Sequence, residues 1–154
     1  MTHAEDTRPA PPDALPSLRV LVVEDLPRVQ GLLRELIDDP GRIEVAGVVA
    51  TESDAVSQFE RLDPDAVVID LNLREGTGLG VLMALRGKPR PEHLPRPMLI
   101  VLTNHALPVL RSACLNAGAD HFLDKSHDFH KVRTLLEQAW RESRETSNAP
   151  PLRH

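Results

Sequence analysis

The chain has 154 residues, with 18 lysines and arginines against 23 aspartates and glutamates, and its formal net charge is −5. This length suits one domain with a well-formed core. The acidic balance argues against a nonspecific nucleic-acid coat and against anionic membranes as partners. No apolar run reaches the length of a membrane helix, and the N-terminus lacks a signal-peptide core, so we expect a soluble cytoplasmic protein.

Both ends of the chain are predicted to be disordered tails, residues 1–17 because they are rich in proline and residues 143–154 because they are polar. Between them, apolar patterns predict alternating elements. The predicted strands are 18–23, 43–49, 66–69, 98–102 and 119–123, and the predicted helices are 26–37, 52–62, 79–86, 107–117 and 128–142. Five successive βα units predict an α/β fold, a doubly wound parallel sheet with helices on both faces, over residues 18–142.

Single residues refine these boundaries. Pro27 lies where a first helical turn tolerates proline, and Gly118 is placed to end the fourth helix. Gly47 interrupts the second strand and suggests an edge or a bulge, while Asp128 is a candidate cap for the last helix. The loop 88–97 contains four prolines and is long for its position, so we expect it to project from the body.

Polar side chains stand where four predicted strands end: Glu24 and Asp25, Asp70, Thr103, and Lys125. The carboxyl ends of parallel strands share one edge of a sheet, where open α/β folds bind ligands. Three acids brought together there repel one another and need a cation, and carboxylate oxygens suit Mg²⁺ better than zinc or copper. Taken singly, each of these residues could equally be an ordinary surface or loop residue.

Other chemistry is weaker in this sequence. Cys114 lies in an apolar helical pattern, which predicts a buried, inert thiol, and a catalytic cysteine is the weaker alternative. A zinc site at His121, His127 and His130 is conceivable, but no cysteine or paired carboxylate completes it. A dispersed surface set of histidines is therefore favoured.

From 18 to 142 the chain resembles the receiver domains of bacterial two-component response regulators, especially the stand-alone chemotaxis-type receivers. An acidic pair follows the first strand, aspartate the third, threonine the fourth and lysine the fifth. The resemblance implies a flavodoxin-like sheet of strand order 2-1-3-4-5. It also implies Mg²⁺ held by Asp25, Asp70 and the backbone carbonyl of Asn72, with Glu24 holding a metal-bound water.

By the same resemblance, Asp70 is the phosphoacceptor, taking its phosphoryl group from a sensor histidine kinase or a histidine phosphotransferase. Thr103 and Lys125 would bond the phosphoryl oxygens, and Thr103 and Phe122 would switch. The fourth helix, fifth strand and fifth helix would then bind a downstream protein or a second copy. We expect no enzymatic activity beyond self-phosphorylation and autodephosphorylation. No helix-turn-helix or other output domain follows, so we expect no direct DNA binding.

Two positions depart from the family pattern. Phe122 lacks the hydroxyl of the usual tyrosine, and Ser126 follows Lys125 where the family has proline after a cis peptide bond. A cis bond to serine would cost about 3 kcal/mol. These departures and the loop 88–97 motivate an alternative, a phosphorylation-independent scaffold or adaptor. A third hypothesis, a Mg²⁺-dependent phosphatase of another α/β family, would want a second acid where Asn72 stands.

Overall fold

The structure is a computed structural model that describes residues 17–90, 92 and 94–148. Strands and helices alternate along the chain: β1 (Leu18–Val23), α1 (Pro27–Ile37), β2 (Ile43–Val49), α2 (Glu52–Leu62), β3 (Ala66–Asp70), α3 (Gly78–Arg86), β4 (Met98–Thr103), α4 (Pro108–Asn116), β5 (His121–Asp124) and α5 (Lys131–Asn148). Residues 1–16 and 149–154 of the predicted tails lie outside the described residues. Within the described part, no helix combines the length and apolar character that crossing a bilayer requires.

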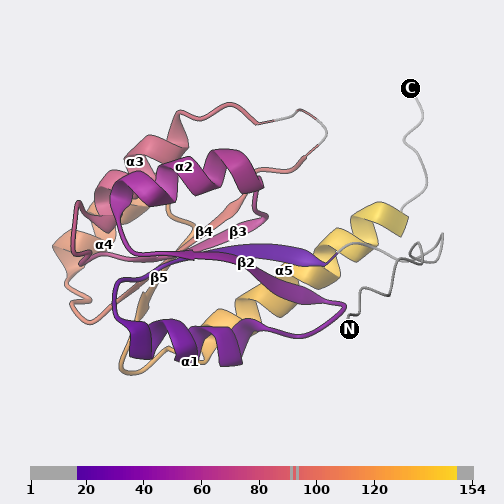
Figure 1. Cartoon of the computed structure of the whole chain (residues 1–154), viewed down its shortest axis with the longest axis horizontal. Coiled ribbons are helices and arrows are strands. Elements are labelled where there is room, and N and C mark those ends of the chain that lie inside the picture. Colours follow the sequence, from indigo (N-terminus) through magenta and orange to yellow (C-terminus); the bar gives the residue numbers. More distant parts are fainter. Residues whose placement is uncertain (1–16, 91, 93, 149–154) are drawn as a thin grey trace, which may run out of the picture.

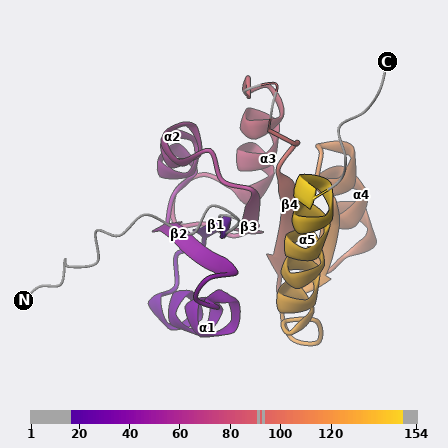
Figure 2. The ribbon, with the colours of Figure 1, turned by 90° about the vertical axis from the view of Figure 1, so that its right-hand side faces the viewer.

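All strand pairs are parallel, and the sheet order is β2-β1-β3-β4-β5, which confirms the predicted doubly wound fold. Figures 1 and 2 show α1 and α5 on one face of the sheet and α2, α3 and α4 on the other. Side chains alternate between the two resulting cores. In β3, for example, Val67 and Ile69 pack toward α2, α3 and α4, while Ala66 and Val68 pack toward α1 and α5.

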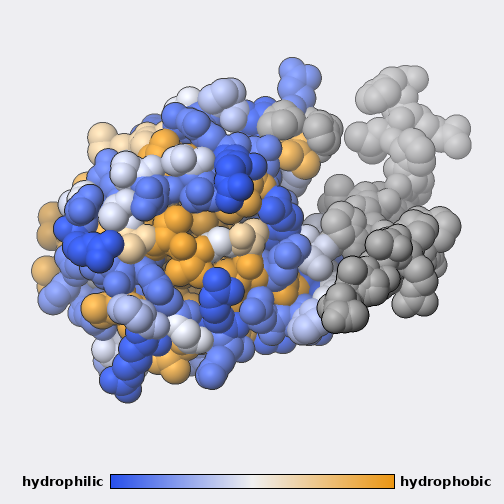
Figure 3. All heavy atoms as spheres, in the orientation of Figure 1, coloured by the Kyte–Doolittle hydropathy of each residue, from blue (hydrophilic) through white to orange (hydrophobic). Residues whose placement is uncertain are grey.

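The edge strand β2 carries the irregularity that Gly47 predicted. Val20 pairs with Val45 and Leu21 pairs with Gly47, so one residue of β2 is skipped and the strand bulges. Figure 3 shows apolar side chains exposed over β2 between α1 and α2. The Val45 amide on this edge strand cannot pair with another strand, since it donates to Asp38 Oδ1 at 2.9 Å.

The predicted boundaries fail mainly at the last two elements. β5 begins at His121, two residues later than predicted, and α5 begins at Lys131. The Asp128 carboxylate turns back to accept from the Asp124 amide at 3.1 Å, so it does not cap the helix as predicted. α5 continues to Asn148, six residues beyond the predicted end of the domain at residue 142, because no glycine or proline interrupts 143–148.

Candidate functional site

The acidic side chains predicted from the sequence converge at one edge of the sheet. β1 and β3 are neighbours with Val23 opposite Ile69, so the residues that end them emerge side by side. Ligand oxygens of Glu24, Asp25 and Asp70 all lie within 4.8 Å of one another. Glu24 and Asp70 are 1% and 5% exposed. These two carboxylates are therefore largely shielded from the water that would otherwise screen their charges, whereas Asp25 is half-buried.

A single lysine faces these carboxylates. Lys125 Nζ lies 2.9 Å from Glu24 Oε1 and 3.4 Å from Asp70 Oδ2, and the lysine side chain is 8% exposed. The Lys125 amide donates to the Thr103 carbonyl at 2.8 Å, which ties the residue after β5 to the end of β4. No other cation pairs with these acids among the described residues. Three carboxylates against one ammonium leave a charge that a divalent cation with oxygen ligands fits.

The electrostatics of Glu24 also favour a bound cation at this edge. Burial raises the pKa of its carboxyl group, and the negative charge of Asp70 raises it further. The bond from Lys125 and the Leu26 amide, 3.1 Å from Oε2, oppose that rise in pKa without cancelling it. Gln30 Nε2 donates to the Glu24 carbonyl at 2.6 Å and fixes the backbone here. The Glu24 side chain is thus held in place although its burial disfavours the charged form.

The loop between β3 and α3 folds back on the end of β3. The Asn72 amide donates to Asp70 Oδ1 at 3.3 Å, and the Gly78 amide donates to the Leu71 carbonyl at 3.0 Å. A Cβ at Gly78 would collide with the Asp70 carbonyl oxygen and would lie 2.7 Å from Leu71 Cα. Glycine at position 78 therefore lets α3 begin directly against the end of β3.

Thr103 ends β4 and Phe122 lies in β5. Asp70 pairs with Leu102, so Thr103 lies one residue further along the neighbouring strand. Thr103 is fully buried, and its Oγ1 accepts from the His105 amide at 3.0 Å. Phe122 is 8% exposed and belongs to the core beneath α2, α3 and α4.

Two weaker alternatives from the sequence were a catalytic cysteine and a zinc site. Cys114 is buried at 1% exposure, and burial raises the pKa of its thiol, as expected of an inert cysteine. Among the described residues, the acids at 24, 25 and 70 form the only group of three or more metal-ligating side chains, so the histidines build no zinc site there. No cis peptide bond occurs in the described ranges, and the Lys125–Ser126 bond is trans.

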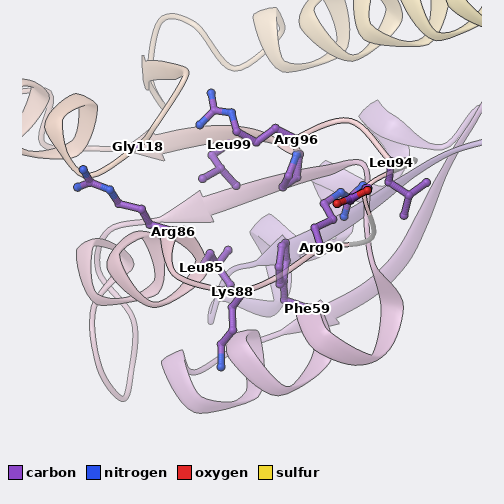
Figure 4. A pocket seen from close by; sticks show the side chains of 11 residues that line it. Phe59, Leu85, Arg86, Lys88, Arg90, Leu94, Arg96, Leu99 and Gly118 are labelled. Atoms are coloured by element: carbon purple, nitrogen blue, oxygen red, sulfur yellow. The ribbon is translucent and has the colours of Figure 1, made fainter.

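A cavity of about 330 Å³ lies near the opposite ends of the strands and is lined by Phe59, Leu85, Arg86, Lys88, Arg90, Glu92, Leu94, Arg96, Pro97, Leu99 and Gly118 (Figure 4). Three of the four cationic side chains that line the cavity already have protein partners. Lys88 pairs with Glu60, Arg96 pairs with Asp120 at 3.0 Å, and Arg86 donates to the Asn116 carbonyl at 3.1 Å.

Arg90 is the remaining cation, and its Nε donates to the Pro95 carbonyl at 2.7 Å. Its two terminal nitrogens are buried without a hydrogen bond to any described residue, and Nη2 lies 3.7 Å from Asp65 Oδ1. Enclosed nitrogens cannot meet an incoming anion in this arrangement. The acidic edge therefore stands as the candidate functional site.

Comparison with known proteins agrees with this geometry. A family model described as the response regulator receiver domain matches residues 20–137. The chain belongs to this family. The match includes every residue of the acidic edge, from Glu24 to Lys125, and it places the chain among the receiver domains of two-component systems.

Curated relatives place this receiver domain in proteins of different lengths. A protein-glutamate methylesterase/protein-glutamine glutaminase of Nitrobacter winogradskyi is 36% identical over 118 residues, 77% of this chain and 27% of the relative. The nitrate/nitrite response regulator protein NarP of Escherichia coli is 32% identical over 76% of this chain and 52% of its own length. An uncharacterized 14.6 kDa protein of Leptolyngbya boryana is 32% identical, with 80% of this chain and 91% of the relative covered. The chain thus spans about a quarter of the methylesterase and about half of NarP.

Solved receiver domains share the architecture. The receiver domain of the sensor histidine kinase PA1611 from Pseudomonas aeruginosa is 29% identical, with a TM-score of 0.66 over 81% of this chain and 98% of that one. That structure has a magnesium ion coordinated in its active site cleft. The response regulator domain of CheB from Thermotoga maritima is 23% identical, with a TM-score of 0.66 over 88% of this chain and all of that one, and shows the same fold.

Proposed function

We propose that this receiver domain accepts a phosphoryl group on Asp70 from the phosphohistidine of a sensor histidine kinase or a histidine phosphotransferase. The observation that carries the proposal is the set of three acidic side chains within 4.8 Å of one another, two of which, Glu24 and Asp70, pair with Lys125. The magnesium ion in the PA1611 receiver supports the same use of this edge.

The donor set suits Mg²⁺, which takes oxygen ligands and keeps several of its waters. Asp25, Asp70 and the backbone carbonyl of Asn72 would hold the ion, with Glu24 binding one of its waters. When bound, Mg²⁺ neutralises charge that develops on the phosphoryl oxygens.

Three side chains of the protein would carry out the rest of the phosphoryl transfer. An ionised Asp70 carboxylate is already a nucleophile and needs no general base: it forms an O–P bond as the P–N bond of the phosphohistidine breaks, and the bonding electrons leave with the imidazole. Lys125 Nζ already lies 3.4 Å from Asp70 Oδ2 and would pair with a phosphoryl oxygen. The Thr103 hydroxyl, which accepts from the His105 amide, keeps its own proton free to donate to another phosphoryl oxygen.

A phosphoryl group on Asp70 would add a charge of about −1.5 to −2 beside Thr103 and Lys125 and draw both toward it. We propose that α4, β5 and α5 repack in response and bind a downstream protein or a second copy. Val109 and Leu107 at the start of α4 are 72% and 54% exposed and offer apolar contacts on this face. On this proposal, the phosphorylated domain would signal through protein contacts on this face.

Acetyl phosphate with Mg²⁺ tests the proposal, read by phosphate-affinity electrophoresis. The wild-type protein should give a retarded band, and Asp70→Asn should give none because the nucleophile is lost. Asp63→Asn is the matched control: Asp63 is exposed with φ of 46°, a conformation that asparagine tolerates, and this variant should shift like wild type. An Asp70→Asn protein that shifts as far as wild type would remove Asp70 from the assignment.

The buried phenylalanine at 122 favours a second candidate, a receiver-like scaffold that works without phosphate. Phe122 packs in the core at 8% exposure and has no hydroxyl to satisfy at the surface, which favours one fixed position. A Mg²⁺ titration followed by amide chemical shifts separates the two candidates. Shifts at Asp25, Asp70 and Asn72 support the phosphoacceptor, and unchanged spectra support the scaffold.

A further inference from the structure

One acidic residue outside the cluster contacts the loop that follows Asp70. Glu52 begins α2, and its Oε1 accepts from the Thr77 amide at 3.0 Å. The Glu52 amide in turn donates to the Glu75 carbonyl at 3.0 Å. The first turn of α2 is thus bonded to the loop in both directions.

Contacts within the loop continue from Thr77 to the site. Thr77 forms an isolated bridge with Asn72. The Asn72 amide donates to Asp70 Oδ1 at 3.3 Å. Thr77 also caps α3, since its Oγ1 accepts from the Gly80 amide at 2.9 Å. Glu52 therefore holds the residue that fixes both the start of α3 and the strand-like pairing of Asn72.

Gly80 leaves free the space that the Glu52 carboxylate occupies. A Cβ on Gly80 would lie 2.6 Å from Glu52 Cδ and 2.7 Å from Oε2. Real Cβ atoms do not approach other atoms this closely, so any larger residue at 80 would push the Glu52 side chain away. The glycine at this helical position leaves room for the carboxylate against the first turn of α3.

We propose that Glu52 is a positioning residue for the Asp70 site. By fixing Thr77, it sets the loop conformation in which the Asn72 amide contacts Asp70 Oδ1. The inference rests on the proposed function for its link to Mg²⁺ and phosphate, but the role of Glu52 in the loop belongs to the metal-free protein as well.

Three variants of the first turn of α2 test the proposal. Glu52→Ala should raise the Mg²⁺ dissociation constant, measured calorimetrically, about five-fold, the effect of one lost net hydrogen bond. Glu52→Gln keeps an acceptor oxygen for the Thr77 amide and should stay within about two-fold of wild type. Asp54→Ala removes the same charge from the same turn of α2 and should also stay within about two-fold. Equal losses in Glu52→Gln and Glu52→Ala would assign the effect to charge and overturn the proposal.

Gly80→Ala reaches the same contact from the other side. It should weaken Mg²⁺ binding as Glu52→Ala does, even though alanine favours the helix more than glycine. The double variant should be no weaker than Glu52→Ala alone, because both changes remove one contact. Additive losses would overturn the proposal.

A readout without metal separates this proposal from the proposed function. Exchange of the Thr77 amide hydrogen in the metal-free protein should accelerate in Glu52→Ala and stay slow in Glu52→Gln. Unchanged exchange in Glu52→Ala overturns the role of Glu52, whatever the metal does. A wild-type protein that binds no Mg²⁺ and accepts no phosphate refutes the proposed function instead, while faster exchange would still support Glu52 as the residue that fixes the loop.

Discussion

At the scale of the residue, Lys125 holds the acidic site together in the absence of metal. Its ammonium group pairs with two carboxylates of the cluster, with Nζ 2.9 Å from Glu24 Oε1 and 3.4 Å from Asp70 Oδ2. A divalent cation at the same carboxylates would supply the same neutralisation. The lysine and a bound metal ion would therefore stabilise the folded protein by overlapping means.

This overlap predicts how Lys125→Met behaves. Removal of one partner of a buried ion pair costs about 3 kcal/mol, so the variant should unfold at lower urea concentration than wild type in EDTA. Excess Mg²⁺ should then stabilise the variant more than it stabilises wild type, because more uncompensated negative charge is available to the ion. Lys131→Met, which removes a lysine with a 55% exposed side chain, is the control and should respond to Mg²⁺ as wild type does. Equal stabilisation of Lys125→Met and wild type by Mg²⁺ would contradict the shared role.

At the scale of the element, the start of α3 is set by its contact with the end of β3. Gly78 has no room for a Cβ against the Asp70 and Leu71 backbone, whereas Gly31 in α1 is exposed and has nothing within 4 Å of a Cβ. Both residues are glycines within helices, so they differ mainly in what surrounds them.

The two glycines therefore respond to alanine with opposite signs. Gly78→Ala should destabilise the protein by about 1–3 kcal/mol, since backbone atoms cannot yield as a side chain can. Gly31→Ala should stabilise it by about 0.5–1 kcal/mol through helix propensity alone. Urea unfolding midpoints measure both changes. A Gly78→Ala protein as stable as wild type would show that the contact between α3 and β3 is loose.

At the scale of the whole molecule, what the sequence could predict follows from how far each signal extends. Apolar runs such as 66–69 identify a strand buried on both faces, and alternation with helical patterns determines the layered fold. The acidic edge could be predicted for the same reason, because a parallel sheet brings the ends of its strands together. The strand order came from the family resemblance.

Contacts between loops were beyond the sequence. Nothing in the sequence around Glu52 or Gly80 indicates that one fills the space beside the other, since the contact depends on how α2 and α3 lie side by side.

The end of α5 was misplaced for a different reason. Polar residues at 143–148 suggested a tail, yet Arg144 stacks on Trp140 at 4.9 Å and Ser143 Oγ donates to the Trp140 carbonyl at 2.7 Å. A polar stretch without glycine or proline can continue a helix although it has no apolar face.

The two cores share one sheet, and this predicts cooperative unfolding of the whole domain. Leu82 of α3 is fully buried in the core under α2, α3 and α4, whereas Trp140 of α5 packs against the core on the opposite face. Leu82→Ala should lower the free energy of unfolding by about 2–5 kcal/mol.

Trp140 is the single tryptophan and the chain has no tyrosine, so its fluorescence reports the α5 face alone. In Leu82→Ala, the fluorescence transition in urea should shift as far as the far-UV circular dichroism transition, because neither face stays folded when the strands separate. Met83→Ala, at a neighbouring side chain that is 63% exposed, should leave both transitions within about 0.5 kcal/mol of wild type. Two separate transitions in Leu82→Ala would mean that α1 and α5 stay folded on the sheet after the other face is lost, and that changes at the α3 face need not reach α5.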